Sequence, residues 1–259
     1  MTDAQTNTEA AGDGDGDADR RAALAAALAA VTDRVERAAR AAGRDPAAVR
    51  LLAVTKTFPA RDAALLTDLG VTDLGENRDQ EAGPKAEELR RLRPRAAPRW
   101  HMVGRLQRNK ARSVLRWADV VQSVDSARLA DALQQAALVA LDAGHGPDRP
   151  LEVLLQASLD DNPARGGCPL SDLPALADHV AGLDRLRLRG LMAVAPLGAD
   201  PDRAFDALRR AADALRAAHP QATELSAGMT ADLEAAIRHG STCVRVGTAL
   251  LGGRPLASP

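Results

Sequence analysis

The chain has 259 residues, 46% of them hydrophobic, which is enough for one large domain with a sizeable core. Its formal net charge of −1 gives no electrostatic reason to expect nucleic acid as the main partner. No apolar run reaches the length of a membrane span, and the beginning lacks the basic start and apolar stretch of a signal peptide, so we expect a soluble cytoplasmic protein.

The beginning of the chain, residues 1–21, is polar, rich in Gly and Asp, and without hydrophobic periodicity. We expect a disordered tail there, because such a segment buries too little apolar surface to offset the entropy lost on ordering. The rest, residues 22–259, is assigned to one folded domain. It opens with a predicted helix, whose apolar side chains recur on one face at Leu24, Leu28 and Val31.

Beyond this helix, short apolar runs alternate with Ala-, Leu- and Arg-rich helical segments. The runs predict eight buried parallel strands, at residues 51–54, 71–74, 100–103, 120–124, 151–157, 188–194, 224–226 and 243–246. Eight strands with helical connections, in a chain of this length, predict a single TIM (β/α)8 barrel of the α/β class. A doubly wound parallel sheet is the alternative that the same alternation allows.

A lysine, Lys56, follows the first predicted strand in the run LLAVTK. The carboxyl end of a barrel strand is where TIM barrels place their active sites. A partly desolvated amine there can attack a carbonyl carbon and form a Schiff base. The alternative is a lysine that simply extends from the strand end into solvent.

Polar residues also follow the next two strands. Asn77 comes after the second and offers a donor and an acceptor on the same face as Lys56, although an ordinary strand-to-helix turn would look alike. His101 lies within the third strand, where we favour a satisfied core histidine over a base. The basic run that begins at Arg105 suits a basic surface or, as we favour, the solvated start of a helix.

The two loops after the last strands carry small residues suited to a phosphate group. These are the positions where TIM barrels often bind phosphate through backbone N–H groups and hydroxyls. Glycine lets a ligand approach the backbone, and Ser and Thr donate hydrogen bonds; the candidates are Ser226, Gly228, Gly247 and Thr248. Ordinary barrel turns remain the alternative.

Six segments in order resemble the pyridoxal phosphate homeostasis protein family, also called the YggS/PROSC family. They are LLAVTKTFPA (51–60), LGENRDQE (74–81), WHMVGRLQRNK (100–110), VQSVDSARLADAL (121–133), LRGLMAV (188–194) and ELSAGMTADLEAAIRHGSTCVRVGTALLG (224–252). Together they cover essentially everything beyond the tail, and several are long and specific.

The resemblance implies a barrel like the N-terminal domain of alanine racemase, without that enzyme's second domain, and pyridoxal 5′-phosphate as the cofactor. It implies that Lys56 holds the cofactor as a Schiff base, that Asn77 lies beside it and that Arg245 faces the pyridine nitrogen. It also implies that Ser226, Gly247 and Thr248 hold the phosphate. We add Gly228 and Met229, from the same loop as Ser226, to the expected cofactor-binding set.

The chain departs from the family pattern at a few positions. Ala227 stands where the family usually has Met, Thr230 where it often has Ser, and Arg165 where a lysine usually precedes the glycine pair. Arginine keeps the charge at that last position but cannot form a Schiff base. Any role of a second lysine there in cofactor exchange is therefore in doubt.

The residues favour binding over turnover. Pyridoxal phosphate is the best electron sink when its pyridine nitrogen is protonated, and a permanently charged Arg245 opposite that nitrogen would keep it unprotonated. The chain has no tyrosine to act as a second base. We therefore expect no catalytic residues and a protein that buffers or delivers the cofactor, with apo forms of cofactor-dependent enzymes as partners. The alternatives are a small amino-acid racemase or lyase, and a regulatory or interaction module that docks onto apoenzymes through an Arg-rich surface.

Two further expectations concern metals and assembly. The two cysteines, Cys168 and Cys243, lie far apart and in no metal-binding motif, so we expect ordinary thiols and no metal site. Because the domain on which racemases build their dimer is missing, we expect a monomer.

Overall fold

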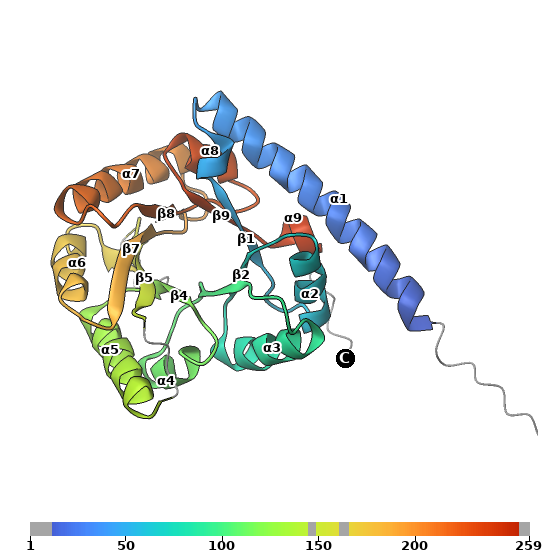
Figure 1. Ribbon diagram of the computed structural model, residues 1–259. Helices are drawn as coiled ribbons and strands as arrows, with labels where there is room; N and C mark the ends of the chain where they lie inside the picture. Colours follow the sequence, from blue (N-terminus) through green and yellow to red (C-terminus); the bar gives the residue numbers. More distant parts are fainter. Residues whose placement is uncertain (1–11, 145–148, 161–165, 254–259) are drawn as a thin grey trace, which may run out of the picture.

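A closed barrel of parallel strands lies inside a ring of helices in the computed structural model, which describes residues 12–144, 149–160 and 166–253 (Figure 1). The strands are β1 Arg50–Val54, β2 Asp73–Glu76, β3 Arg99–Met102, β4 Val120–Val124, β5 Leu151–Ser158, β6 Cys168–Pro169, β7 Leu186–Met192, β8 Glu224–Ser226 and β9 Cys243–Val246. The helices are α1 Gly12–Ala41, α2 Ala60–Asp68, α3 Asp79–Leu92, α4 Ala111–Val114, α5 Ala127–Asp142, α6 Leu173–Ala181, α7 Pro201–Ala218, α8 Leu233–Arg238 and α9 Thr248–Leu251, with 3-10 turns η1 Pro46–Ala48 and η2 Arg108–Lys110.

The strand order closes the barrel. Neighbouring strands pair in the order β4-β3-β2-β1-β9-β8-β7-β5, and β4 pairs with β5 to complete the circle. All of these pairings are parallel, and β6 pairs only with β5. The predicted TIM barrel is therefore confirmed, and the doubly wound sheet is ruled out because an open sheet has two unpaired edges.

The predicted strands differ from the observed ones mainly at their ends. The second strand begins at Asp73 rather than Val71. The Val71 amide instead donates to the carbonyl oxygen of Leu66 and closes the end of α2, with Gly70 at a φ of +93°. This is the usual left-handed end of a helix, and it uses Val71, which the apolar pattern assigned to the strand.

The first helix is longer than the sequence predicted. The range 1–21 was expected to be disordered, but α1 begins at Gly12; residues 1–11 lie outside the described residues. Once the Ala-rich part is helical, each added residue costs little, because only nucleation is expensive. Asp17 and Arg20, inside the predicted tail, form ion pairs with Arg61 and Asp62 of α2, which hold this end of the helix against the barrel.

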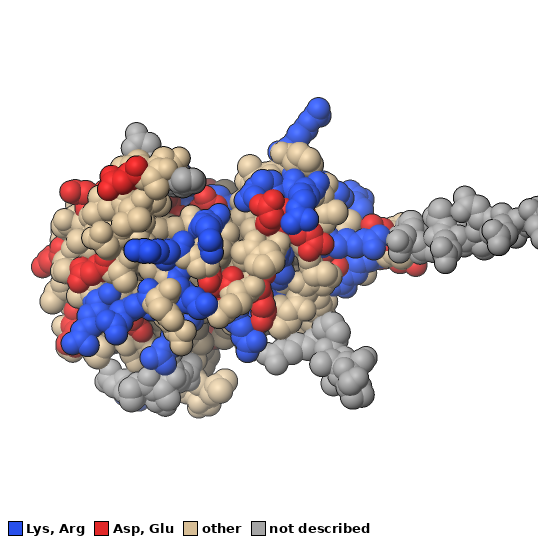
Figure 2. Space-filling view, turned by 90° about the horizontal axis from the view of Figure 1, so that it is seen from below, with Lys and Arg blue, Asp and Glu red and all other residues tan. Residues whose placement is uncertain are grey.

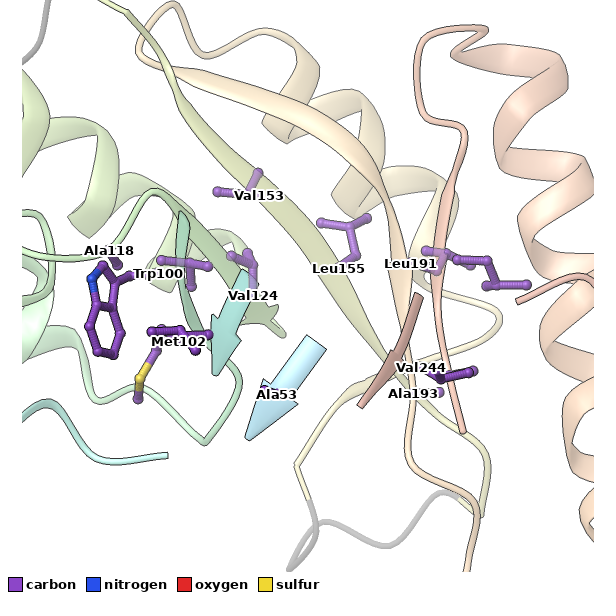
Figure 3. Close-up of a cluster of buried hydrophobic side chains, with 14 of the residues drawn as sticks. Ala53, Trp100, Met102, Ala118, Val124, Val153, Leu155, Leu191, Ala193 and Val244 are labelled. Atoms are coloured by element: carbon purple, nitrogen blue, oxygen red, sulfur yellow. The ribbon is translucent and has the colours of Figure 1, made fainter. Parts of the chain in front are cut away.

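The main core lies between the strands and the helices, as the cluster in Figure 3 shows. Ala53 and Val244 point to this layer, whereas their strand neighbours Leu52 and Cys243 belong to a separate cluster. Alternate residues of a strand point to opposite faces, so this second set fills the barrel interior. At about 25 cal/mol per Å2, burial of this apolar surface is the main favourable contribution to folding.

Candidate functional site

A cavity of about 560 Å3 opens among the loops at the carboxyl ends of the strands, and we call it the cofactor cavity. Its walls come from segments after β1, β2, β3, β7, β8 and β9. Six of the residues predicted from the sequence line it: Lys56, Asn77, Met229, Arg245, Gly247 and Thr248. The barrel thus brings together residues up to 192 positions apart in the chain, counted from 56 to 248.

Lys56 is half-buried and lies just beyond the end of β1. The next residue, Thr57, has a φ of +67°, the single positive value for a non-glycine residue in the described part of the chain. A β-branched residue in this conformation is a genuine outlier and costs on the order of 1–3 kcal/mol. Strain of this kind persists where the surrounding structure fixes the backbone, so the turn that carries Lys56 is held in one conformation.

A buried ion pair lies directly behind this turn. Lys85 Nζ of α3 donates to Glu76 Oε1 at 2.6 Å and to the carbonyl oxygen of Thr55 at 2.7 Å. Thr55 Oγ1 donates to the same Glu76 oxygen at 2.6 Å. Burial raises the pKa of Glu76, and the Lys85 ammonium opposes that rise. The pair therefore joins β1, β2 and α3 immediately beneath Lys56.

Arg245 is 5% exposed and lies in the wall of the cofactor cavity. Its guanidinium donates to Ser226 Oγ and to the carbonyl oxygen of Ala193, both at 2.8 Å. Burial lowers the pKa of Arg245, and no described carboxylate lies within ion-pair distance of it. A buried guanidinium held by neutral acceptors suits a neutral acceptor on a ligand, such as a ring nitrogen.

Two predicted residues, Ser226 and Gly228, do not line the cavity. Ser226 is fully buried inside the barrel, where its hydroxyl donates to Gln122 Oε1 at 2.7 Å and accepts from Arg245. Gly228 has a φ of +92°, and a Cβ there would lie 2.7 Å from that of Ala236, so it shapes the loop beneath Met229. A phosphate contact by either residue stays a prediction.

His101 is the core histidine that the sequence favoured. It is fully buried, with Nε2 at 2.8 Å from Asp73 Oδ1 and Nδ1 at 3.0 Å from Gln122 Nε2. With Ser226 and Arg245 these side chains form a hydrogen-bonded chain across the barrel interior. Burial lowers the pKa of His101, and Asp73 partly opposes this, so the ring is held neutral at neutral pH.

Sequence reasoning missed the apolar walls of the cavity. Phe58, Val103 and Val194 line it, as do Thr57 and Thr230. Val194 is 37% exposed, although an apolar strand end reads as core in the sequence. Val103 and Val194 are the last residues of their predicted strands, and this position at the carboxyl ends of barrel strands was the available signal. Arg165, the departure from the family pattern, lies outside the described residues.

The cavity fits pyridoxal phosphate by the chemistry of its lining. It holds an amine that can react with an aldehyde, a fixed guanidinium that can donate to a ring nitrogen, and apolar side chains that can pack against a ring. Gly247 and Thr248 open α9, and the first amides of a helix have no partner within it, which suits a phosphate. Among the described residues, no cluster of three metal-binding side chains occurs and no helix is long and apolar enough to cross a bilayer.

Comparison with known proteins decides the family. Residues 27–255 match the model of the alanine racemase N-terminal domain. The pyridoxal phosphate homeostasis protein of Mycobacterium tuberculosis is 49% identical over 250 residues, which cover 93% of this chain and 96% of that protein. Its counterpart in Escherichia coli is 40% identical, over 88% of this chain and 95% of the relative. The chain belongs to the pyridoxal phosphate homeostasis protein family.

Solved structures agree with this assignment. PipY of Synechococcus elongatus, with pyridoxal phosphate bound, is 34% identical and has a TM-score of 0.74, covering 88% of this chain and all of that one. Alanine racemase of Corynebacterium glutamicum has a TM-score of 0.62 at 17% identity, which shows the shared fold alone. The match covers 89% of this chain and 60% of the racemase chain.

Proposed function

We propose that this family member binds pyridoxal 5′-phosphate in the cofactor cavity and buffers or delivers it, with little or no catalysis. The observation that carries the proposal is that Lys56 and Arg245 line one cavity together with Gly247 and Thr248. The names of the relatives and the ligand bound by PipY support it. When bound, the cofactor would supply an aldehyde that links to the Lys56 amine as a Schiff base.

Each lining residue has a proposed task in binding. Lys56 holds the cofactor covalently, Arg245 donates to the ring nitrogen, and Asn77 contacts the cofactor from the β2 side. Met229 covers the mouth, where its side chain is 40% exposed. The loops at Ser226 to Gly228 and at Gly247 to Thr248 hold the phosphate, the first of them by its backbone, since the Ser226 hydroxyl is already bonded within the barrel.

The chain offers an unambiguous test of the covalent link, because lysine occurs only at positions 56, 85 and 110. Purified protein would be incubated with pyridoxal phosphate, reduced with borohydride, digested and mapped by mass spectrometry. We expect a yellow protein whose label lies on Lys56 and is lost in Lys56→Ala. The matched control, Lys110→Ala, keeps both colour and label. A label on Lys85 or Lys110, or a colourless protein, contradicts the proposal.

The lining also argues against turnover. Lys56 and Arg245 are the ionisable residues among those that line the cavity in the described part of the chain, and arginine does not exchange protons near neutral pH. His101 is buried away from the cavity, and the chain contains no tyrosine. A racemase needs acid–base groups on both faces of its substrate. A small racemase or lyase is therefore the second candidate, favoured only by its shared fold.

Turnover is tested by incubating the loaded protein with L-amino acids and measuring the D-form by chiral chromatography. We expect no racemisation above that of free pyridoxal phosphate. A rate typical of enzymes, lost in Lys56→Ala, would instead establish the racemase.

Delivery, assembly and location complete the proposal. We propose that apo forms of pyridoxal phosphate-dependent enzymes receive the cofactor, and that the protein is a cytoplasmic monomer. Transfer to an apoenzyme is measured by its regained activity, with the spontaneous release rate as the baseline. Transfer no faster than release would show passive buffering. Light scattering after gel filtration gives the molar mass, and a dimer would contradict the monomer.

A further inference from the structure

A second and larger cavity, of about 1000 Å3, lies beside the cofactor cavity at the carboxyl ends of β2, β3 and β4. It is lined by the start of α3, the loop and η2 turn after β3, and the start of α5. We call it the basic cleft, defined by five cationic side chains: Arg78, Arg105, Arg108, Lys110 and Arg128. Neither Lys56 nor Arg245 lines it, so it is separate from the proposed cofactor site.

The wall between the two cavities is tightly packed. Asn77 lines both of them. A Cβ at Gly104 would lie 2.2 Å from the carbonyl oxygen of Asn77, so only glycine lets the loop after β3 approach so closely. This contact holds Arg105 and the η2 turn at the edge of the barrel mouth, and the cleft is therefore a fixed part of the fold.

The cleft concentrates positive charge in a chain whose net charge is −1. Five basic and two acidic residues line it, a net charge of +3. In the described part of the chain, Arg105, Arg108, Lys110 and Arg128 form no ion pair within 4.0 Å. Elsewhere the surface arginines are commonly paired, as the i,i+4 pairs on α1 and α7 illustrate. Figure 2, which views the side of α3 and α4, shows basic side chains gathered at its lower left.

The two acidic residues of the cleft are engaged with neutral donors. Asp79 is buried and accepts from Trp117 Nε1 at 2.9 Å, while Asp125 accepts from Ser126 Oγ at 3.2 Å. Helix α5, 16 residues long, begins at the cleft with no acidic residue in its first turn and no side-chain cap. Its dipole therefore adds to the positive potential that the cations create.

We propose that the basic cleft binds an oligophosphate ester such as a nucleoside diphosphate. Such a ligand carries about three negative charges, which match the net positive charge of the cleft. Guanidinium groups also bind phosphate oxygens in pairs. The exposed amides of Gln107 and Asn109 add donors and acceptors. A single phosphate would leave most of these cations without a partner.

The test is calorimetric titration of the full-length protein, with and without pyridoxal phosphate, using pyrophosphate, ADP and inorganic phosphate as probes. We expect pyrophosphate and ADP to bind one site more tightly than inorganic phosphate, and the affinity to fall as salt is added. The double variant Arg108→Ser/Lys110→Ser should bind about a hundredfold more weakly, since each of the two charged hydrogen bonds is worth roughly a factor of ten. The matched control, Arg203→Ser on exposed α7, should bind like the parent protein.

Three outcomes would overturn the proposal. The first is the absence of binding at millimolar concentrations of the probes, and the second is an equal loss of affinity in Arg203→Ser. The third is binding of a polyglutamate peptide without binding of pyrophosphate or ADP, which would make the cleft a protein-docking surface. Circular dichroism checks that the variants fold. The replaced side chains point to solvent or line the mouth of the cleft. Because apo protein is one arm, a failure to bind pyridoxal phosphate would leave this test intact.

Discussion

Replacing Lys85 by methionine tests the role of the buried pair beneath Lys56. Methionine keeps most of the volume but removes the donor to Glu76 Oε1 and to the Thr55 carbonyl. Glu76 is fully buried, and its Oε2 already has no described partner. Breaking such a pair leaves an uncompensated charge and costs about 3–5 kcal/mol, a large part of the 5–15 kcal/mol typical of a whole protein.

The pH dependence separates this cause from simple loss of packing. Burial already raises the pKa of Glu76, and without Lys85 that pKa rises further. A carboxyl whose pKa is higher in the folded state binds more protons there. The stability of the protein therefore falls as the pH rises from the ordinary pKa of the carboxyl towards its pKa in the folded protein. The loss in Lys85→Met should therefore be largest near neutral pH and shrink in mild acid, where Glu76 becomes protonated.

Urea unfolding of the apo protein, followed by the fluorescence of buried Trp100 and Trp117, measures these losses at about pH 7.5 and about pH 5. The control is Lys85→Met/Glu76→Gln, in which the orphaned charge is removed and most of the stability should return. A loss below about 1 kcal/mol near neutral pH, or an equal loss at both pH values, would refute the reasoning.

Three further predictions follow from single contacts. Gly104→Ala should destabilise the fold by about 1–3 kcal/mol, because its Cβ would overlap the Asn77 carbonyl, whereas Gly16→Ala on exposed α1 should stabilise it slightly; urea midpoints compare them. Burial raises the pKa of Cys168 to about 11, so a thiol reagent near pH 8 should label it about a hundredfold more slowly in native than in unfolded protein, and equal rates would contradict the burial. Burial lowers the pKa of His101, so its contribution to stability is present above its ordinary pKa and is lost as the pH falls. In His101→Gln the free energy of unfolding should therefore change less between about pH 7 and pH 5, and urea unfolding at several pH values checks this.

The fold was predictable because its signals are local. Buried parallel strands are continuous apolar runs, and β4, β8 and β9 have the bounds that these runs predicted. Helix α7 also begins on a local signal, with Asp200 as its N-cap and Pro201 at its first position. The errors in the predicted bounds lie where tertiary contacts determine the bound. Examples are the end of α2 and Asp17, whose ion-pair partner lies 44 residues away.

The site was predictable at the ends of strands and much less so inside the barrel. Lys56 and Thr248 follow strands, and the barrel rule alone places them at one face. Ser226 is the last residue of β8 and points inward to Gln122, a partner 104 residues away. Which face such a residue occupies depends on strand register, and a shift of one residue would have turned it outward.

Arg245 links the geometry of the barrel to the proposed function. Its guanidinium is held by the Ser226 hydroxyl and the Ala193 carbonyl, and through Ser226 it joins the chain that ends at His101 and Asp73. Both direct partners are neutral, so the positive charge is not cancelled nearby and a protonated ring nitrogen would be repelled. An unprotonated nitrogen is a poor electron sink, and a site fixed in this way supports holding the cofactor more than transforming a substrate.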